Sequence, residues 1–175
     1  MEYKWTYKTP NNFDDIIMTS DGEYLTGLWF INSKDSLKHN NNQKEQELDI
    51  FKETSKWLNI YFSGKNPGFT PKYKLKNSTP FREEVSNIMN TIPYGHTISY
   101  NDISKIIAKS HKIERMSSQA VGGAVGWNPI CIIIPCHRVV GSNGSLTGYG
   151  GGLKNKIALL THEQNDMSKF FVTKK

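Results

Sequence analysis

A run of five apolar residues, ICIII at positions 130–134, lies between two prolines and is followed by the sequence Cys-His-Arg. A short apolar run bounded in this way predicts a strand that is buried on both faces. Proline donates no hydrogen bond to a sheet, so Pro135 marks the end of this strand. The chain has to fold around this segment, which brings a thiol, Cys136, and an imidazole, His137, to the point where the backbone leaves the sheet.

The first half of the chain has the pattern of a small α/β domain. Two strand-like runs flank Asp21-Gly22, which is typical of a β-hairpin turn. Apolar residues then recur at helical spacing until Gly64, a helix stop, and the polar run at 39–47 is assigned to a loop and the first helical turn. Residues 65–77 hold two prolines and no periodicity, so we interpret them as a linker.

The second half predicts several short helices. Thr79-Pro80 has the pattern of an N-cap followed by a proline in the first turn, and an apolar stripe follows it. Ser99 and Asp102 match a capping box that opens a second helix. The residues expected to face inward on that helix are Ile103, Ile106 and Ile107.

A further short helix is expected to begin near Ser117 or Ser118, and with the helix before it the pair resembles a helix-turn-helix. Small residues, AVGGAVG at 120–126, leave much of its surface almost without side chains. Either this helix packs tightly against another, or something bulky approaches it closely. The remaining predicted elements are a hairpin-like wing with Asn143-Gly144 at its tip and a last helix with Leu153, Ile157 and Leu160 inward.

The expected fold is therefore of the α/β (α+β) class with two domains. Residues 1–77 form the small N-terminal α/β domain, including the linker, and residues 78–175 form a mainly helical, winged helix-turn-helix-like domain.

Charge is distributed unevenly along the chain. The 22 Lys and Arg residues exceed the 16 Asp and Glu residues by 22 − 16 = 6, and residues 79–175 carry five of these six charges. A basic half favours a polyanionic partner such as nucleic acid, although a basic surface kept for solubility explains the charge equally well. No stretch approaches the roughly 20 apolar residues of a membrane helix, and the N-terminus has no apolar signal core, so a cytoplasmic protein is expected.

The two cysteines, Cys131 and Cys136, are not expected to form a disulfide in a reducing cytosol, and no CxxC or Cys/His cluster predicts a zinc site. Cys136 is either a buried structural thiol or a reactive one. The neighbouring His137 and Arg138 supply a base and a positive charge, which lower a thiol pKa from its usual value of about 8.5. A thiolate is a strong nucleophile at neutral pH, so Cys136 is a candidate for covalent chemistry.

The sequence IPCHRVVGSNGSLTGYGGGLKNKIALL, at residues 134–160, resembles the signature of the O6-alkylguanine-DNA alkyltransferases, the methylated-DNA–protein-cysteine methyltransferases. The likeness extends upstream through AVGGAVGWNPI and IPYGHTISYNDIS, so that it covers about residues 79–163. It implies DNA repair by direct damage reversal: an alkyl group moves irreversibly, once per protein molecule, from O6-alkylguanine in DNA to Cys136. O4-alkylthymine is a further candidate substrate, and no metal or cofactor is implied.

The resemblance also implies roles for single residues. Cys136 is the acceptor, His137 its base through a water, Glu163 orients His137, Tyr100 donates a proton or hydrogen bond to the guanine, and Asn128 pins the segment that carries the thiol. The implied base pocket consists of Val139, Tyr149 and Gly150. The implied DNA contacts are Tyr100, Asn101, Ser118, Gln119, Ala120, Gly122 and Arg138.

The implied partner is double-stranded DNA with a flipped-out O6-alkylguanine, bound by a monomer with no obligatory protein partner and no membrane. The small-residue helix would enter the minor groove, where large side chains do not fit. Two features depart from the family pattern. Gln119 stands where well-known relatives place an arginine that fills the space of the extruded nucleotide, and the N-terminal half has no cysteine for the zinc that some relatives bind there.

Three other functions fit parts of the sequence. A non-catalytic lesion-binding protein would share the DNA-binding parts but lack Cys136. A cysteine hydrolase would turn over and usually takes its histidine from a distant part of the chain. A DNA-binding regulator would carry the thiol incidentally. Transfer to Cys136 separates the alkyltransferase from all three.

Overall fold

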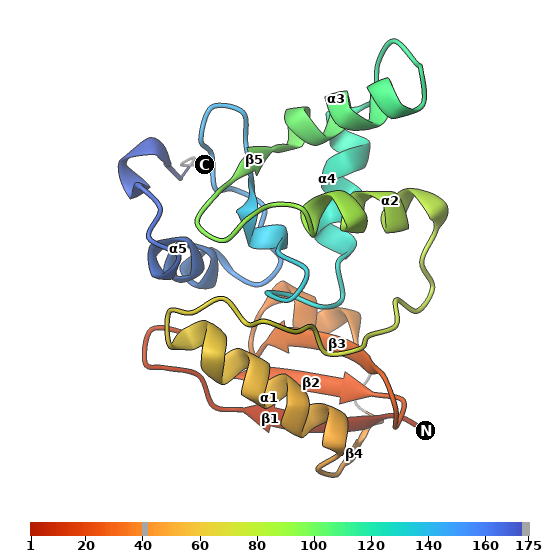
Figure 1. Ribbon diagram of the computed structural model, residues 1–175, viewed down its shortest axis with the longest axis vertical. Helices are drawn as coiled ribbons and strands as arrows, with labels where there is room; N and C mark the ends of the chain where they lie inside the picture. Colours follow the sequence, from red (N-terminus) through yellow and green to blue (C-terminus); the bar gives the residue numbers. More distant parts are fainter. Residues whose placement is uncertain (40–41, 173–175) are drawn as a thin grey trace.

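The computed structural model describes residues 1–39 and 42–172. Its N-terminal part is a four-stranded sheet with strand order β3-β2-β1-β4 and one helix, α1, across it (Figure 1). The predicted hairpin is confirmed, since β2 and β3 are antiparallel and Gly22 has a φ of 111° in the turn between them. The elements of this part are β1 (Tyr3–Tyr7), β2 (Ile16–Ser20), β3 (Leu25–Phe30), η1 (Lys34–Lys38), β4 (Lys44–Glu45) and α1 (Asp49–Phe62).

The predicted helix of this part is confirmed as α1, and it ends before Gly64, whose φ is 90°. Its first turn begins later than expected. Of the polar run at 39–47, residues 40–41 lie outside the described part, and the rest forms loop and the short strand β4 rather than a helical turn. The side chains that α1 buries against the sheet include Phe51, Trp57 and Leu58.

The C-terminal part is mainly helical, as predicted (Figure 1). Thr79 caps its first helix by accepting a hydrogen bond from the backbone of Arg82, and Ser99 and Asp102 form the predicted capping box of α3. Helix α4 packs against both α2 and α3. The elements are α2 (Pro80–Met89), β5 (Ile98–Ser99), α3 (Tyr100–Ser110), α4 (Ser118–Trp127), η2 (Cys136–Arg138), β6 (Val139–Val140), α5 (Leu153–His162) and η3 (Met167–Lys169).

The apolar run at 130–134 is buried but is not a strand, so this prediction is wrong. Only Ile130 bridges β3, through Leu28, and the residues after it form a tight turn in which Ile132 has a φ of 69°. Its backbone groups bond partly inside the turn, where the amide of Ile134 donates to the carbonyl of Ile130 at 3.2 Å, and partly to β3, where the amide of Cys131 donates to the carbonyl of Leu28 at 3.0 Å. A short apolar run shows that a segment is buried but does not determine its backbone conformation.

The predicted wing is not a β-hairpin. Its first arm, β6, pairs in parallel with β5, and the segment that follows turns at Gly144, whose φ is 94°. Ser145 then bridges Phe171 near the end of the chain. The tip at Asn143-Gly144 is a tight turn closed by the Gly141 amide, which donates to the Ser145 carbonyl at 2.8 Å, but β6 pairs with β5 and Ser145 with Phe171 instead of the two arms forming a ladder with each other.

Two residues predicted to face inward are exposed: Ile106 on α3 at 47% and Ile157 on α5 at 36%. Ile103 and Ile107 are buried as expected, as is Leu160. On α5 the buried face instead includes Asn155 and Lys156, because polar groups of the protein interior meet this helix.

The two parts of the protein share one apolar core. Residues 63–79, which include the predicted linker, form no helix or strand, although Tyr73 bridges Leu25 of β3. The division of the chain at residue 78 stays a prediction. Among the described residues, none of the helices has the length and apolar character needed to span a membrane.

Candidate active site

Cys136 opens the short helix η2 directly after Pro135, in the middle of the shared core. It is 6% exposed. Hydrogen bonds from the side chains of Cys131 and Asn128 and the positive charge of Lys156 lower the pKa of the Cys136 thiol, against the opposing effect of its burial. The site therefore favours the thiolate, which is the nucleophilic form of cysteine.

His137 points away from the solvent and donates from Nε2 to Oε2 of Glu163 at 2.7 Å. Both side chains are fully buried. Burial lowers the pKa of His137 although Glu163 favours its charged form, so the imidazole is neutral at neutral pH. Within the described residues Nδ1 has no hydrogen-bond partner, which leaves this nitrogen able to accept a proton.

Besides the bond from His137, Glu163 accepts four hydrogen bonds from three residues. Arg138 donates to it twice, at 2.8 Å and 3.0 Å, the Tyr61 hydroxyl donates at 2.6 Å, and the backbone of Gly95 donates at 3.1 Å. Burial opposes ionisation, but the hydrogen bonds and charges of His137 and Arg138 lower the pKa of Glu163 far below its ordinary value. The carboxylate is therefore charged and fixed in orientation.

Arg138, which we predicted to contact DNA, uses its guanidinium inside the protein. Its side chain is 12% exposed, and its third nitrogen donates to the backbone oxygen of Ile92 at 2.8 Å. With Glu163 taking its other donors, we reassign Arg138 from DNA contact to the support of this carboxylate.

Asn128 follows α4 and is buried. Its side chain donates to the backbone oxygen of Ile134 at 2.9 Å and accepts from the backbone nitrogen of Ile130 at 3.0 Å. It thus bridges both ends of the turn that precedes Cys136 and ties the turn to the end of the small-residue helix.

Tyr100 begins α3, and its ring contacts the face of α4 at Gly122, where a Cβ atom would lie 4.0 Å from the ring. Burial and the nearby Cys136 raise the pKa of Tyr100 to about 12. The phenol therefore keeps its proton at neutral pH beside the nucleophile, as a hydrogen-bond or proton donor must.

The three residues predicted for a base pocket lie in two environments. Val139 is fully buried, and its carbonyl accepts from the ammonium of Lys156 at 2.8 Å. Tyr149 and Gly150 line a surface cavity of about 460 Å³ between the loop at 147–152 and Lys34 of η1. The Tyr149 side chain also neighbours the Cys136 thiol. Cys136 itself does not line this cavity, whereas Tyr149 lines it and is near enough to the thiol for the two to affect each other electrostatically.

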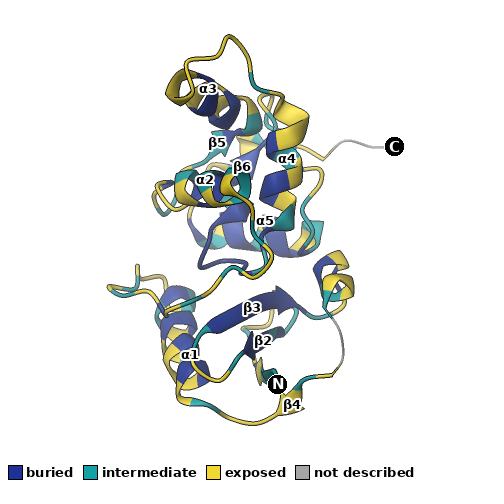
Figure 2. Cartoon of the chain, turned by 90° about the vertical axis from the view of Figure 1, so that its right-hand side faces the viewer, coloured by how far each residue is buried: buried dark blue, intermediate teal, exposed yellow. Residues whose placement is uncertain are grey.

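The predicted DNA contacts other than Arg138 surround the contact between α3 and the start of α4. Asn101, Ser118 and Gln119 line a hollow of about 690 Å³ together with Lys105 and Arg115. The first turn of α4 is exposed, whereas the face of α4 that packs against α2 and α3 is buried, as Figure 2 shows. Of the other predicted contacts, Ala120 is exposed, and Gly122 and Tyr100 are partly exposed.

Sequence reasoning missed four residues of the site: Tyr61, Asp35, Lys156 and Cys131. The carboxylate of Asp35 in η1 lies 3.3 Å from the Cys131 sulfur and forms an ion pair with Lys38 at 2.6 Å. Burial lowers the pKa of Lys156 to about 8, and its ammonium lies 5.6 Å from the centre of the Tyr149 ring. Lys156 lies on the buried face of α5, so a lysine among the apolar positions of the predicted helix was a signal in the sequence. Tyr61 and Asp35 belong to the N-terminal part and reach the site only through the tertiary fold.

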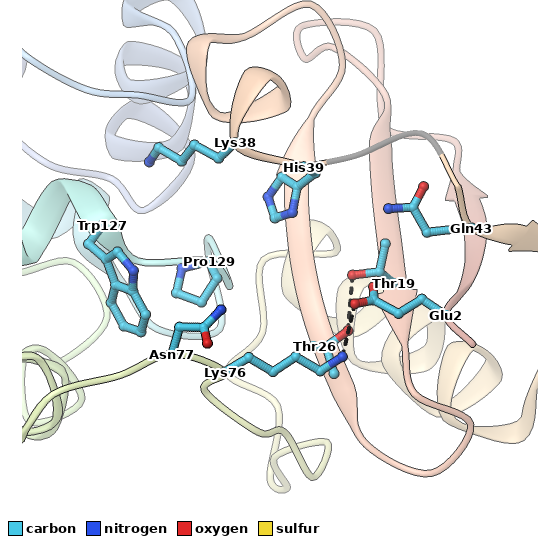
Figure 3. A pocket seen from close by; sticks show the side chains of 10 residues that line it. All are labelled: Glu2, Thr19, Thr26, Lys38, His39, Gln43, Lys76, Asn77, Trp127 and Pro129. Carbon is cyan, nitrogen blue, oxygen red and sulfur yellow. Dashed lines mark hydrogen bonds and ion pairs between the residues drawn. The ribbon is translucent and has the colours of Figure 1, made fainter.

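A separate cavity of about 320 Å³ lies between the two parts of the protein (Figure 3). Lys76, on its wall, is paired with Glu2 at 2.9 Å. None of the residues that line this cavity belongs to the predicted site. They include Thr19, Thr26, His39, Trp127 and Pro129.

Comparison with protein families matches both parts of the chain. Residues 3–72 match the family described as "6-O-methylguanine DNA methyltransferase, ribonuclease-like domain", and residues 80–165 match "6-O-methylguanine DNA methyltransferase, DNA binding domain".

Individual relatives agree with this result. A methylated-DNA–protein-cysteine methyltransferase of Methanosarcina acetivorans is 39% identical over 148 residues, which is 85% of this chain and 90% of the relative. The crystal structure of Mycobacterium tuberculosis OGT in complex with DNA has a TM-score of 0.76 at 33% identity and covers 96% of this chain and 94% of its own. The chain belongs to the 6-O-methylguanine DNA methyltransferase family.

Proposed function

We propose that this protein repairs DNA by taking an alkyl group from O6-alkylguanine onto Cys136. One observation carries the proposal: a cysteine with a lowered thiol pKa lies beside a buried, neutral histidine that is oriented by a charged glutamate. Family membership and the DNA complex of a relative support it. The product is an S-alkylcysteine, a thioether that is not hydrolysed under mild conditions, so each molecule acts once.

In the proposed reaction the Cys136 thiol gives its proton towards Nδ1 of His137, the nitrogen that is not bonded to Glu163. The sulfur forms a bond with the alkyl carbon while the bond from that carbon to O6 breaks. The electron pair of the broken bond passes into the guanine ring, and the Tyr100 hydroxyl donates to the ring at that moment. Guanine is restored, and no external reductant or cofactor takes part.

The proposed substrate is double-stranded DNA, because the exposed start of α4 and the hollow beside it have the shape and charge for a backbone. Lys105 and Arg115 outnumber the one acidic residue there, Glu114, and Asn101, Ser118 and Gln119 supply polar groups. The alkylated base leaves the stack, at a cost of a few kcal/mol, to reach the buried sulfur. Opening of the loop at Tyr149 admits it. We further propose that the protein acts as a monomer in the cytoplasm.

Replacing Tyr100 with phenylalanine is expected to slow methyl transfer on the order of 10²-fold, because general acid groups contribute at least this much. The ring that packs against Gly122 remains, so the affinity for duplex DNA stays the same. Single-turnover rates and a DNA titration measure the two effects. Tyr24→Phe, in the N-terminal half, is the matched control, and a Tyr100→Phe rate equal to that of the control contradicts the role of the hydroxyl.

Replacing Gln119 with arginine is expected to speed transfer a few-fold. The longer, charged side chain can occupy the space of an extruded nucleotide and hydrogen-bond the orphaned base, whereas glutamine brings no charge. Gln46→Arg adds the same charge to the N-terminal half and serves as the control. Rates that do not rise above those of the control contradict this reading of Gln119.

Stoichiometry tests the proposed function as a whole. The protein is incubated with an excess of duplex that contains O6-methylguanine, and the modified base remaining in the DNA is quantified by chromatography after digestion. The loss is expected to stop at one base per protein molecule. Continued turnover, or no loss of the modified base, contradicts the proposal.

A further inference from the structure

Asp35 belongs to the N-terminal part of the protein, but its polar groups contact the C-terminal part. Its side chain is buried, with the residue 5% exposed. The backbone amide donates to the carbonyl of Gly150 at 3.0 Å. One carboxylate oxygen lies 3.3 Å from the Cys131 sulfur, and the other forms the ion pair with Lys38. A buried carboxylate is costly unless it is paired, so these contacts fix its position.

Gly150 lies against the same carboxylate. A Cβ atom added at this position would overlap with one carboxylate oxygen of Asp35 and lie 2.9 Å from the carboxylate carbon. Gly150 is not among the glycines of the described chain that have a positive φ, so its backbone could accept a larger residue. The close approach of Asp35, and not the backbone conformation, therefore explains why only glycine fits here.

The loop at 147–152 has little stiffness of its own. Four of its six residues are glycines, which have more backbone freedom to lose on folding than any other residue. Its position is therefore set by its neighbours. On the side of α5, Asn155 donates to the carbonyl of Gly151 at 2.8 Å. On the side of the N-terminal part, Asp35 holds Gly150.

Asp35 also meets the segment that leads to the nucleophile. Cys131 lies in the turn at 130–134, which Asn128 closes and which ends directly before Pro135 and Cys136. The carboxylate of Asp35 thus lies between this turn and the loop at 147–152. Any shift of Asp35 would change how the loop and the turn sit relative to each other.

We propose that Asp35 is a positioning residue for alkyl transfer, which holds the loop at 147–152 in place beside the turn that carries Cys136. The inference rests on the proposed function, in which this loop admits the alkylated base. Asp35 acts through Gly150 and Cys131 and not on the reacting atoms. Its effect can be large, because a misplacement of about 1 Å can slow a reaction on the order of 10²-fold.

Asp35→Ala removes the carboxylate and keeps the backbone amide. At saturating duplex with O6-methylguanine, its single-turnover methyl transfer is expected to be about 10-fold slower than that of the parent protein. Its affinity for duplex without a lesion should stay the same, because the hollow beside α4 is not altered. In the protein without DNA, hydrogen–deuterium exchange of the loop at 147–152 should become faster.

Asp35→Asn is the conservative variant, since the amide keeps the size of the side chain and one acceptor oxygen. It is expected to restore most of the rate and the slow exchange of the loop. Asp21→Ala is the matched control: it breaks another aspartate–lysine pair of the N-terminal part, with Lys74, and the bonds of a turn. This control should leave both readouts at the parent's values, and urea unfolding checks that all variants are folded.

Gly150→Ala tests the same contact from the other side. The added methyl group displaces the carboxylate of Asp35, so transfer is expected to slow. When Asp35→Ala is combined with it, the methyl group has room, and the combined variant should be no slower than the slower of the two single variants. Independent defects would multiply instead.

Four results overturn the proposal: exchange of the loop in Asp35→Ala that equals the parent's, transfer at the parent's rate in spite of faster exchange, a loss of affinity for unmodified duplex as large as the loss of rate, or multiplied defects in the combined variant. A parent protein that transfers no methyl group contradicts the proposed function instead. The exchange measurement needs no DNA, so it still decides whether Asp35 holds the loop.

Discussion

Replacing Cys136 with serine is expected to abolish alkyl transfer while DNA binding persists. A serine hydroxyl is not ionised at neutral pH and is a far weaker nucleophile than a thiolate. The hydrogen bonds from Asn128 and Cys131 that favour a sulfur anion do not make the hydroxyl comparably acidic. Apart from Tyr100, the proposed DNA contacts on α3 and at the start of α4 include Asn101, Ser118 and Gln119, which line a hollow that Cys136 does not line, so affinity for duplex DNA is retained.

The measurement is a single-turnover transfer assay on a duplex with O6-methylguanine, together with a DNA titration. Cys131→Ser is the companion variant: it makes the same change at the neighbouring thiol and keeps the nucleophile, so transfer is expected to persist, at a rate reduced to the extent that Cys131 lowers the pKa of Cys136. Transfer by the Cys136→Ser variant at the rate of the parent protein contradicts the assignment of the acceptor. Loss of DNA binding in this variant contradicts the proposal that the DNA contacts on α3 and α4 do not depend on the Cys136 thiol.

Replacing Glu163 with glutamine is expected to lower the free energy of unfolding by about 3–5 kcal/mol, the usual effect of removing one partner of a buried ion pair. The change leaves the Arg138 guanidinium without its countercharge and turns one of the two acceptor oxygens into an NH₂ donor, so one amide oxygen has to serve His137, Tyr61 and Arg138. Urea unfolding at neutral pH measures the loss. Glu53→Gln, on the exposed side of α1, is the control and is expected to change stability little.

The same pair of variants has an expected pH dependence. The pKa of Glu163 is lowered in the folded protein, so its stabilising effect is present above the unfolded value of about 4.3 and is lost as the pH falls below it. The difference in stability between the parent protein and Glu163→Gln should therefore shrink in acid. A difference that is small at neutral pH, or one that grows in acid, contradicts the role given to this carboxylate.

Much of the fold could be predicted because the signals are local. The capping box at Ser99, the cap at Thr79 and the hairpin turn at Gly22 each act over a few residues, and the structure confirms them. The run at 130–134 was predicted wrongly because its apolar residues show only burial, and a buried turn closed by Asn128 is equally apolar. Ile106 was misplaced because the buried face of α3 depends on where α4 packs.

The candidate site also has a part that local sequence signals predict and a part that depends on the tertiary fold. Cys136 and His137 are adjacent in the sequence, so their chemistry could be anticipated before the structure. Tyr61 lies 102 residues from Glu163, and Asp35 lies 96 residues from Cys131. These contacts result from the packing of the N-terminal sheet and helix against the C-terminal part, and no pattern in either segment predicts them.

The central claim is that Cys136 receives the alkyl group, and peptide mass spectrometry tests it most directly. The protein is reacted with duplex DNA containing O6-methylguanine and digested with trypsin, and the peptide of residues 116–138 is fragmented. The account predicts an added mass of one CH₂ unit on Cys136, with Cys131 unchanged. A methyl group on Cys131, or an unmodified peptide after the DNA has lost its lesion, would contradict it.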